Sequence, residues 1–287
     1  MQTPKRYLQT ALRKVGLYER LRASYLCDLY RRVANKQVIR DWRRELNFYR
    51  NLLTGFATDD LIFDIGANEG YKTSLFLSLG ARVVAVEPDV LNQSILGEKF
   101  LKYRLSPKSV VLVAQAVSDT TRVETMWIDE LGSALNSLSR KWVDTLKVDE
   151  RRFGHRLKFA RQKEVQTTTI EELVAEHGSP FFVKIDVEGH ELSVLRGMRR
   201  PVPYLSFEVN LPEFRKEGMQ CVETLRRLAA EGKFNYAVDC RGDGLVLREW
   251  LDASEFSGVL GECDASSIEV FWKTPIGGCK PNVSSID

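Results

Sequence analysis

The chain has 287 residues, of which 44% are hydrophobic and 28% are charged, a composition typical of a globular protein with room for one large domain or two small ones. No apolar run approaches the roughly 20 residues that a membrane-spanning helix needs. The first residues, charged from Lys5 and Arg6 onward, do not resemble a secretory leader, so we expect a cytoplasmic location. Five cysteines, an odd number without a Cys-x-x-Cys pair, argue against a disulfide framework or a zinc site.

Positive charge is concentrated at the start of the chain, where the first 50 residues hold 13 Lys and Arg against four Asp and Glu. Apolar residues recur there at helical spacing, in two stripes between residues 8 and 33 and in a third stripe formed by Ile39, Trp42, Leu46, Tyr49 and Leu53. We expect residues 1–55 to form a basic, amphipathic helical extension. Its helices either pack on the main domain, contact an anionic membrane surface peripherally, or close over an anionic substrate.

Residues 56–275 alternate between short apolar segments, which predict strands, and segments with helical spacing. The expected strands are 61–65, 81–87, 110–117, 123–128, 181–186, 204–209, 236–239 and 268–272. This alternation predicts an α/β domain with a mostly parallel sheet, helices on both faces and an antiparallel pair of strands at its end. Residues 129–166, dense in Lys and Arg in their second half, are expected to form a helical or mobile insertion, and residues 276–287 a C-terminal tail.

The segment LIFDIGANEG, residues 61–70, predicts a buried strand that turns through glycine into a helix beginning at Tyr71. Gly66 and Gly70 allow a sharp bend and a close approach by a ligand, because neither has a Cβ. Such a turn binds nucleotides in open parallel sheets, although the glycines can also serve a tight turn alone. We expect this loop to be the centre of a ligand site.

Further polar residues follow other predicted strands at the same edge of the sheet. Glu87 ends the second strand, where a carboxylate can accept both hydroxyls of a ribose; the alternative is a solvated carboxylate at a strand end. Ala116 and Val117, at the end of the third strand, are small enough to admit a flat adenine ring. In open α/β sheets ligands bind at this edge, so these residues are candidates for one site.

The segment VKIDVEGHE, residues 183–191, carries the densest group of chemical side chains. Lys184 and Asp186 share one face of a strand, and a lysine within an apolar strand requires a partner. Asp186, Glu188 and His190 then gather at the mouth of the strand, where they are candidates for a general base. His190 could instead be a structural or helix-capping residue. Glu208 and Asn210, which end the next strand, can face the same crevice.

The spacing of the glycines bears on the identity of the cofactor. The loop is G-x-x-x-G, with Asn68 where a dinucleotide-binding loop has its middle glycine, so a pyrophosphate approaches less easily. Asp64, two residues before Gly66, suits a cationic ligand. S-adenosylmethionine has a sulfonium, an ammonium and a ribose but no phosphate, and Asp64 and Glu87 complement those groups.

The segments DIGANEG, VEPD and VKIDVEGHELSVLRG resemble the FkbM-type family of S-adenosylmethionine-dependent methyltransferases, over about Leu61 to Asn210. The resemblance implies a Rossmann-like class I methyltransferase fold, a mostly parallel seven-stranded sheet with an antiparallel terminal strand. It implies methyl transfer to an oxygen, commonly a hydroxyl of a sugar or another small molecule. The residues expected to contact the cofactor are Asp64, Gly66, Ala67, Asn68, Gly70, Tyr71, Glu87, Ala116, Val117 and Asp186.

The expected reaction is in-line attack of a substrate hydroxyl on the cofactor methyl group, with His190 or Asp186 as the base and Glu188 orienting one of them. Lys184, Glu208 and Asn210 are assigned to the substrate. A divalent cation on the carboxylates remains an option, but no metal site is predicted. The basic segments suggest an anionic acceptor, and no nucleic acid is expected. Two rival classes stay open: a nicotinamide-dependent oxidoreductase and a non-catalytic or membrane-associated scaffold.

Overall fold

The computed structural model describes residues 36–105, 109–149, 152, 157–242 and 244–275. The helical stripes between residues 8 and 33, most of the basic extension, His155 and the tail at 276–287 lie outside the described residues. Among the described residues, Cys221, Cys240 and Cys263 are free thiols. Within the described chain, no helix has the length and apolar content to cross a bilayer.

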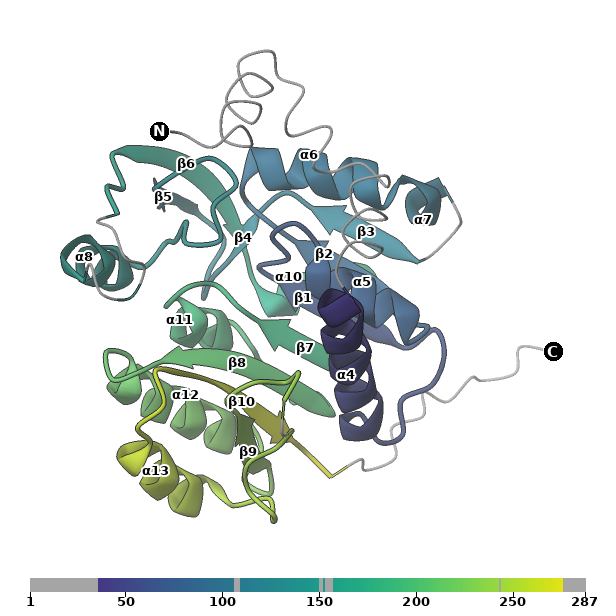
Figure 1. Cartoon of the computed structure of the whole chain (residues 1–287), viewed down its shortest axis with the longest axis vertical. Coiled ribbons are helices and arrows are strands. Elements are labelled where there is room, and N and C mark those ends of the chain that lie inside the picture. Colours follow the sequence, from purple (N-terminus) through teal and green to yellow (C-terminus); the bar gives the residue numbers. More distant parts are fainter. Residues whose placement is uncertain (1–35, 106–108, 150–151, 153–156, 243, 276–287) are drawn as a thin grey trace.

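A seven-stranded sheet forms the centre of the molecule (Figure 1). Its spatial order is β3 (Val110–Val113), β2 (Arg82–Val86), β1 (Leu61–Ile65), β7 (Phe182–Ile185), β8 (Tyr204–Asn210), β10 (Ser267–Lys273) and β9 (Lys233–Ala237). Neighbouring strands are parallel from β3 to β8, whereas β10 is antiparallel to both β8 and β9. The prediction of a mostly parallel sheet with an antiparallel terminal strand is therefore confirmed.

Helices cover both faces of this sheet, as the near-continuous apolar strands require. The helices are α4 (Lys36–Leu52), α5 (Tyr71–Ser78), α6 (Val90–Lys99), α7 (Leu101–Leu105), α8 (Arg140–Val148), α10 (Ile170–His177), α11 (Glu191–Arg196), α12 (Arg215–Leu228) and α13 (Ala253–Glu262). Alternate residues of β1 enter different cores: Phe63 packs in the cluster beneath α10 to α13, and Ile62 in the cluster beneath α4 to α6. The Asp89 side chain caps α6, accepting from the backbone N–H of Leu91 at 2.8 Å.

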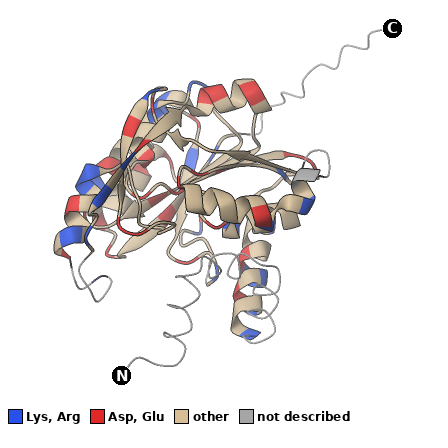
Figure 2. Cartoon of the chain, turned by 90° about the horizontal axis from the view of Figure 1, so that it is seen from above, with Lys and Arg blue, Asp and Glu red and all other residues tan. Residues whose placement is uncertain are grey.

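Helix α4, from the expected N-terminal extension, packs into the same core as the sheet. Its apolar stripe buries Leu46, Tyr49 and Leu52. The Tyr49 ring lies 5.3 Å from that of Phe76 on α5 and 5.9 Å from that of Phe182 on β7. These contacts support the first of the three alternatives for this helix, packing on the main domain. In the view of Figure 2, basic and acidic residues are interspersed over the described elements.

Two segments differ from the predicted elements. The expected strand 110–117 is divided: β3 ends at Val113, and β4 (Ala116–Val117) belongs to a separate three-stranded sheet in the order β4, β6, β5. Within the expected helical or mobile insertion, α8 is indeed helical, but Arg161–Thr168 forms strand β6, antiparallel to β5 (Val123–Ile128). The small sheet and α8 lie beside the carboxyl ends of the central strands (Figure 1).

Candidate active site

The loop after β1 is held in a conformation that requires glycine. Gly66 and Gly70 have φ of +80° and +74°, and a Cβ built on Gly66 would lie 1.8 Å from the carbonyl oxygen of Asp186. The backbone N–H groups of Gly66 and Ala67 both donate to the carbonyl of Val86 at 3.0 Å. The turn is therefore fixed between the ends of β2 and β7, and its backbone faces the space above them.

Glu87 follows β2 and braces the same loop. Its Oε2 accepts a hydrogen bond from the backbone N–H of Asn68 at 2.8 Å, and its Oε1 accepts from Asp89 at 2.8 Å. Burial raises the pKa of Glu87 to about 7, although these bonds oppose the shift. Each oxygen keeps a lone pair that can accept a hydroxyl from a bound ligand.

A cleft of about 700 Å³, called the first cavity here, lies over this loop. Six of the ten residues expected to contact the cofactor line it: Gly66, Asn68, Glu87, Ala116, Val117 and Asp186. Glu188 and His190 line it as well. Its opposite wall comes from residues that sequence reasoning did not select, including Asn92, Met126, Asn136 and Ser137. The insertion thus contributes to this cavity.

The other four expected cofactor residues lie elsewhere. Asp64 is buried behind the loop and accepts a 2.5 Å hydrogen bond from the Thr73 hydroxyl, which ties α5 to β1. Gly70 packs against the Phe100 ring, and a Cβ built on Gly70 would lie 2.5 Å from that ring. Ala67 is buried but is not part of the cavity wall. Tyr71 faces a different cavity, where its hydroxyl donates to Glu45 at 2.8 Å. These positions fit structural roles better than cofactor contacts.

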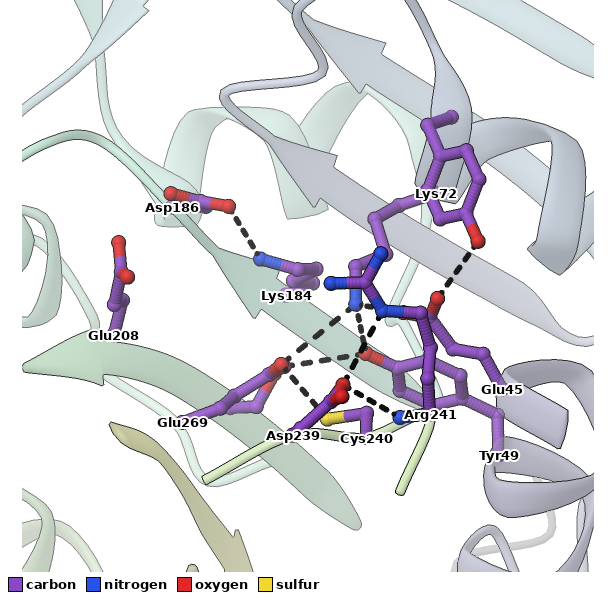
Figure 3. A network of polar contacts seen from close by, with 12 residues as sticks. Glu45, Tyr49, Lys72, Lys184, Asp186, Glu208, Asp239, Cys240, Arg241 and Glu269 are labelled. Carbon is purple, nitrogen blue, oxygen red and sulfur yellow. Dashed lines mark hydrogen bonds and ion pairs between the residues drawn. The ribbon is translucent and has the colours of Figure 1, made fainter. Parts of the chain in front are cut away.

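The second cavity, of about 690 Å³, adjoins the first one, and Asp186 lines both. It is formed by α4, the start of α5, the ends of β7 and β8, residues 238–241 after β9, and the start of β10. Its charged side chains are Glu45, Lys72, Lys184, Asp186, Glu208, Asp239, Arg241 and Glu269, most of them drawn in Figure 3 with their contacts. The side chains come from elements far apart in the sequence, and several carry no local sequence signal.

Asp186 and two glutamates form a carboxylate cluster at the carboxyl ends of β7 and β8. One oxygen from each of Asp186, Glu188 and Glu208 lies within 4.8 Å of the others. Lys184 Nζ donates to Asp186 Oδ2 at 2.9 Å, so the buried lysine has the partner that the sequence required. The Ser267 hydroxyl donates to Glu208 at 2.6 Å, and the Trp142 indole N–H donates to Glu188 at 2.9 Å.

The buried carboxylates of this cluster hold protons more tightly than free glutamate. Burial, reinforced by the charge of Asp186, raises the pKa of Glu208 to about 7. Burial followed by the charges of Glu208 and Asp186 also raises the pKa of Glu188. A carboxyl group with a pKa near 7 can accept a proton at neutral pH, which free glutamate does poorly. Three carboxylate oxygens at this spacing could also hold a divalent cation.

His190, predicted as a catalytic residue, and Asn210, predicted to contact the substrate, are directed elsewhere. His190 Nε2 lies 3.0 Å from the hydroxyl of Ser118, beside β4, and burial lowers the pKa of His190. It lines the first cavity but not the second. Asn210 Oδ1 accepts from Arg152 at 3.2 Å and lines neither cavity. Neither residue is placed where the two cavities meet.

A buried ionic network forms the floor of the second cavity (Figure 3). Lys72 contacts Glu45, donates to the Tyr49 hydroxyl at 2.9 Å and lies 3.7 Å from Glu269. Although burial opposes the shift, Lys72 and Lys184 lower the pKa of Glu269 to about 2. This network joins α4 to α5 and β10, so the N-terminal helix takes part in building the cavity.

The strand order, the glycine turn after the central strand and the acidic residue after its neighbour are those of an S-adenosylmethionine-dependent methyltransferase. The chain belongs to the FkbM methyltransferase family: the model described as "Methyltransferase FkbM domain" matches residues 64–235. This membership favours a methyltransferase over the oxidoreductase and the scaffold considered as alternatives.

Comparison with known proteins identifies a related enzyme and similar folds. The hexuronic acid methyltransferase AglP of Haloferax volcanii is 28% identical over 173 residues, which cover 60% of this chain and 63% of AglP. The chain thus matches less than two thirds of the length of this relative. Among solved structures, precorrin-6y C5,15-methyltransferase from Geobacter metallireducens matches with a TM-score of 0.38 and 10% identity, over 81% of this chain and 88% of that one. A S-adenosylmethionine-dependent methyltransferase from Agrobacterium tumefaciens matches with a TM-score of 0.40 and 11% identity, over 81% and 62%.

Proposed function

We propose that this methyltransferase transfers a methyl group to a hydroxyl of a sugar or glycan. The observation that carries the proposal is the position of Asp186, which lines both cavities. A cofactor in the first cavity and an acceptor in the second would meet at this residue. Holding two reactants in contact supplies a large part of the rate enhancement in a bimolecular transfer.

The first cavity fits S-adenosylmethionine, which when bound supplies an electrophilic methyl group on sulfur. Gly66 leaves a cradle that a Cβ would fill, and the buried Oδ1 of Asn92 has no hydrogen-bond partner among the described residues. Both features suit a ligand with a polar, flat portion. In this proposal Gly66 and Asn68 line the methionine end, Glu87 accepts the ribose hydroxyls, and Ala116 admits the adenine.

Glu208 is the base in this proposal, in place of the His190 expected from the sequence. It lines the second cavity beside Asp186, and its raised pKa suits it to accept the proton of an attacking hydroxyl. Asp186, fixed by Lys184, orients the same hydroxyl at the border of the two cavities. His190 stays in the first cavity, with its ring held by Ser118.

The choice of a hydroxyl over a carboxylate as the methylated group follows from charge. At the border, Glu208 and Asp186 can accept hydrogen bonds from a hydroxyl, and the charge of Asp186 repels an incoming carboxylate. The name of AglP specifies a hexuronic acid. From this relative we infer only that the acceptor of the present chain is a sugar. The expected product is therefore a methyl ether rather than a methyl ester.

The test is product analysis after incubation with isotopically labelled S-adenosylmethionine and a panel of hexosides and hexuronides. Label should enter the sugar and survive mild alkali, which hydrolyses esters but not ethers. Release of the label by alkali would contradict the hydroxyl assignment. Calorimetry with S-adenosylhomocysteine against NAD tests the cofactor separately, and tight binding of S-adenosylhomocysteine alone is the expected result.

A further inference from the structure

We infer that Arg241 binds a carboxylate of the acceptor, so that the preferred acceptor is a sugar acid, held by its acid group and methylated on a hydroxyl. The inference rests on the proposed function and specifies the acceptor of that same site. Arg241 belongs to the segment that follows β9 and lines the second cavity. It is the most exposed of the three cationic side chains there, at 53% against 21% for Lys72 and 3% for Lys184.

The guanidinium of Arg241 is held from one side only. Its Nε donates to Asp239 Oδ1 at 3.2 Å, and its backbone N–H donates to the same oxygen at 2.9 Å. Among the described residues, its two Nη groups have no hydrogen-bond acceptor. Figure 3 draws Arg241 over the network, and besides Asp239 the titratable groups that act on its guanidinium are Glu45 and Tyr71. A planar pair of free N–H donors matches a carboxylate in bidentate geometry.

The other two cations of the cavity are already engaged. Lys184 pairs with Asp186, and Lys72 with Glu45 and Glu269. The five carboxylates outnumber the three cations, but burial holds the pKa of Glu208 at about 7, so this group is partly neutral at physiological pH. The free donors of Arg241 are thus the feature of the cavity that distinguishes an acidic sugar from a neutral one.

The ends of the second cavity carry different groups. Asp186 and Glu208 lie at the carboxyl ends of β7 and β8, and Asp186 also lines the first cavity, whereas Arg241, with Asp239 beside it, follows β9 on the far side of β10. Two strand spacings separate β8 from β9, about 10 Å between backbones, and side chains from both sides narrow the gap. A sugar acid fits this arrangement when its hydroxyl faces Glu208 and its carboxylate faces Arg241.

The family match adds an independent observation. Every residue that lines the first cavity lies within residues 64–235, the segment common to the family. Eight of the 13 residues that line the second cavity, Arg241 among them, lie outside that segment. This division is expected for a family whose members share a cofactor but differ in their acceptors. It assigns the choice of acceptor to residues outside the shared segment, such as Arg241.

The test measures binding, independently of turnover, of two probes: the p-nitrophenyl β-glycosides of D-glucuronic acid and D-glucose. The protein is first saturated with S-adenosylhomocysteine. The wild-type chain should bind the glucuronide at least about tenfold more tightly, a preference that weakens with added salt. Arg241→Gln should abolish the preference while leaving glucoside affinity unchanged, and Arg241→Lys should restore part of it.

Arg248→Gln is the matched control, since Arg248 is an exposed arginine of the same loop region that lies outside the second cavity. It should bind both probes as the wild type does. Equal affinity for the two probes in the wild type, or a preference retained in Arg241→Gln, would overturn the inference. A glucuronide preference combined with an alkali-labile product would instead refute the hydroxyl assignment and leave the role of Arg241 standing.

Discussion

The α-carbon of Gly66 lies directly against the backbone carbonyl of Asp186, so closely that a Cβ on Gly66 would stand 1.8 Å from that oxygen. This contact brings the glycine loop after β1 and the carboxylate cluster after β7 together. The residue that shapes the first cavity is thus packed on the residue that borders the second. A change at Gly66 is expected to disturb both.

Replacing Gly66 with alanine tests this contact. Both the clash and the φ of +80° must be relieved by moving the loop, so we expect a loss of at least about 2 kcal/mol in unfolding free energy and a large loss of affinity for S-adenosylhomocysteine. Denaturant unfolding and calorimetry measure the two effects. Gly258→Ala is the control: Gly258 is in α13, a Cβ there meets nothing within 4 Å, and the change should be neutral or stabilising.

The assignment of Glu208 as the base predicts a specific pH dependence. The wild-type kcat should fall as the pH decreases through about 7, because protonated Glu208 cannot accept the hydroxyl proton. Glu208→Gln should lower kcat about 100-fold and remove this limb while cofactor affinity stays unchanged. Glu223→Gln on the exposed side of α12 is the control for charge. An unaltered pH profile in Glu208→Gln would assign the base elsewhere, with Asp186 the next candidate.

Replacing Lys184 tests whether its ion pair with Asp186 serves to position Asp186 for the reaction or to stabilise the fold. The fully buried lysine is held protonated by Asp186, which raises the pKa of Lys184 even though burial opposes the shift. Removing one partner of a buried ion pair is costly when the remaining charge stays buried, but the charge left here, on Asp186, is on a side chain that is 38% exposed and partly hydrated. We expect Lys184→Met to keep its melting temperature within a few degrees and to lose about 10-fold or more in kcat/KM. Lys233→Met, at an exposed site on β9, should lose neither; a Lys184→Met variant with full activity would show that the ion pair is dispensable.

Glu191 should make the stability of the fold depend on pH. Burial raises the pKa of Glu191 to about 8, against an ordinary value of 4.5, so the native state binds this proton more tightly than the unfolded chain does. Stability from this group is therefore fully present below about pH 4.5 and is lost as the pH rises through about 8, by about 1.4 kcal/mol per unit within that window. Glu191→Gln should flatten the dependence of the unfolding free energy on pH between 5.5 and 8. An equally steep dependence in the variant would place the titrating group elsewhere.

Local patterns were sufficient to predict the central sheet and part of the lining of the first cavity. The glycine turn at Gly66 and Gly70 and the apolar run ending at Asp186 each depend on neighbours within a few residues. Strand β6 escaped prediction because its first four residues are exposed and polar, and it is held by pairing with β5, more than 30 residues earlier. No periodicity marks such a strand.

The second cavity could not be predicted from local patterns either, because its residues come from segments far apart in the sequence. Lys72 lies on a helix, Arg241 in a loop and Glu269 on the antiparallel strand, and each looks like an ordinary surface charge in the sequence. Lys184 is the exception: an ammonium in an apolar strand indicated a buried partner, and Asp186 is that partner. His190 shows the limit of adjacency in the chain: it lines the first cavity with Asp186, but its ring contacts Ser118 and it does not reach the second cavity.

The division of the two cavities between different parts of the chain has an evolutionary consequence. Mutations in residues 238–241 and 267–269 or at Glu45 reach the acceptor side without altering any residue that lines the first cavity. Under the proposed function, substitutions in these segments change acceptor binding while the residues of the cofactor site stay the same. Asp186 lines both cavities, so a substitution there affects the cofactor side and the acceptor side together. We therefore expect this position to vary least among descendants of this chain.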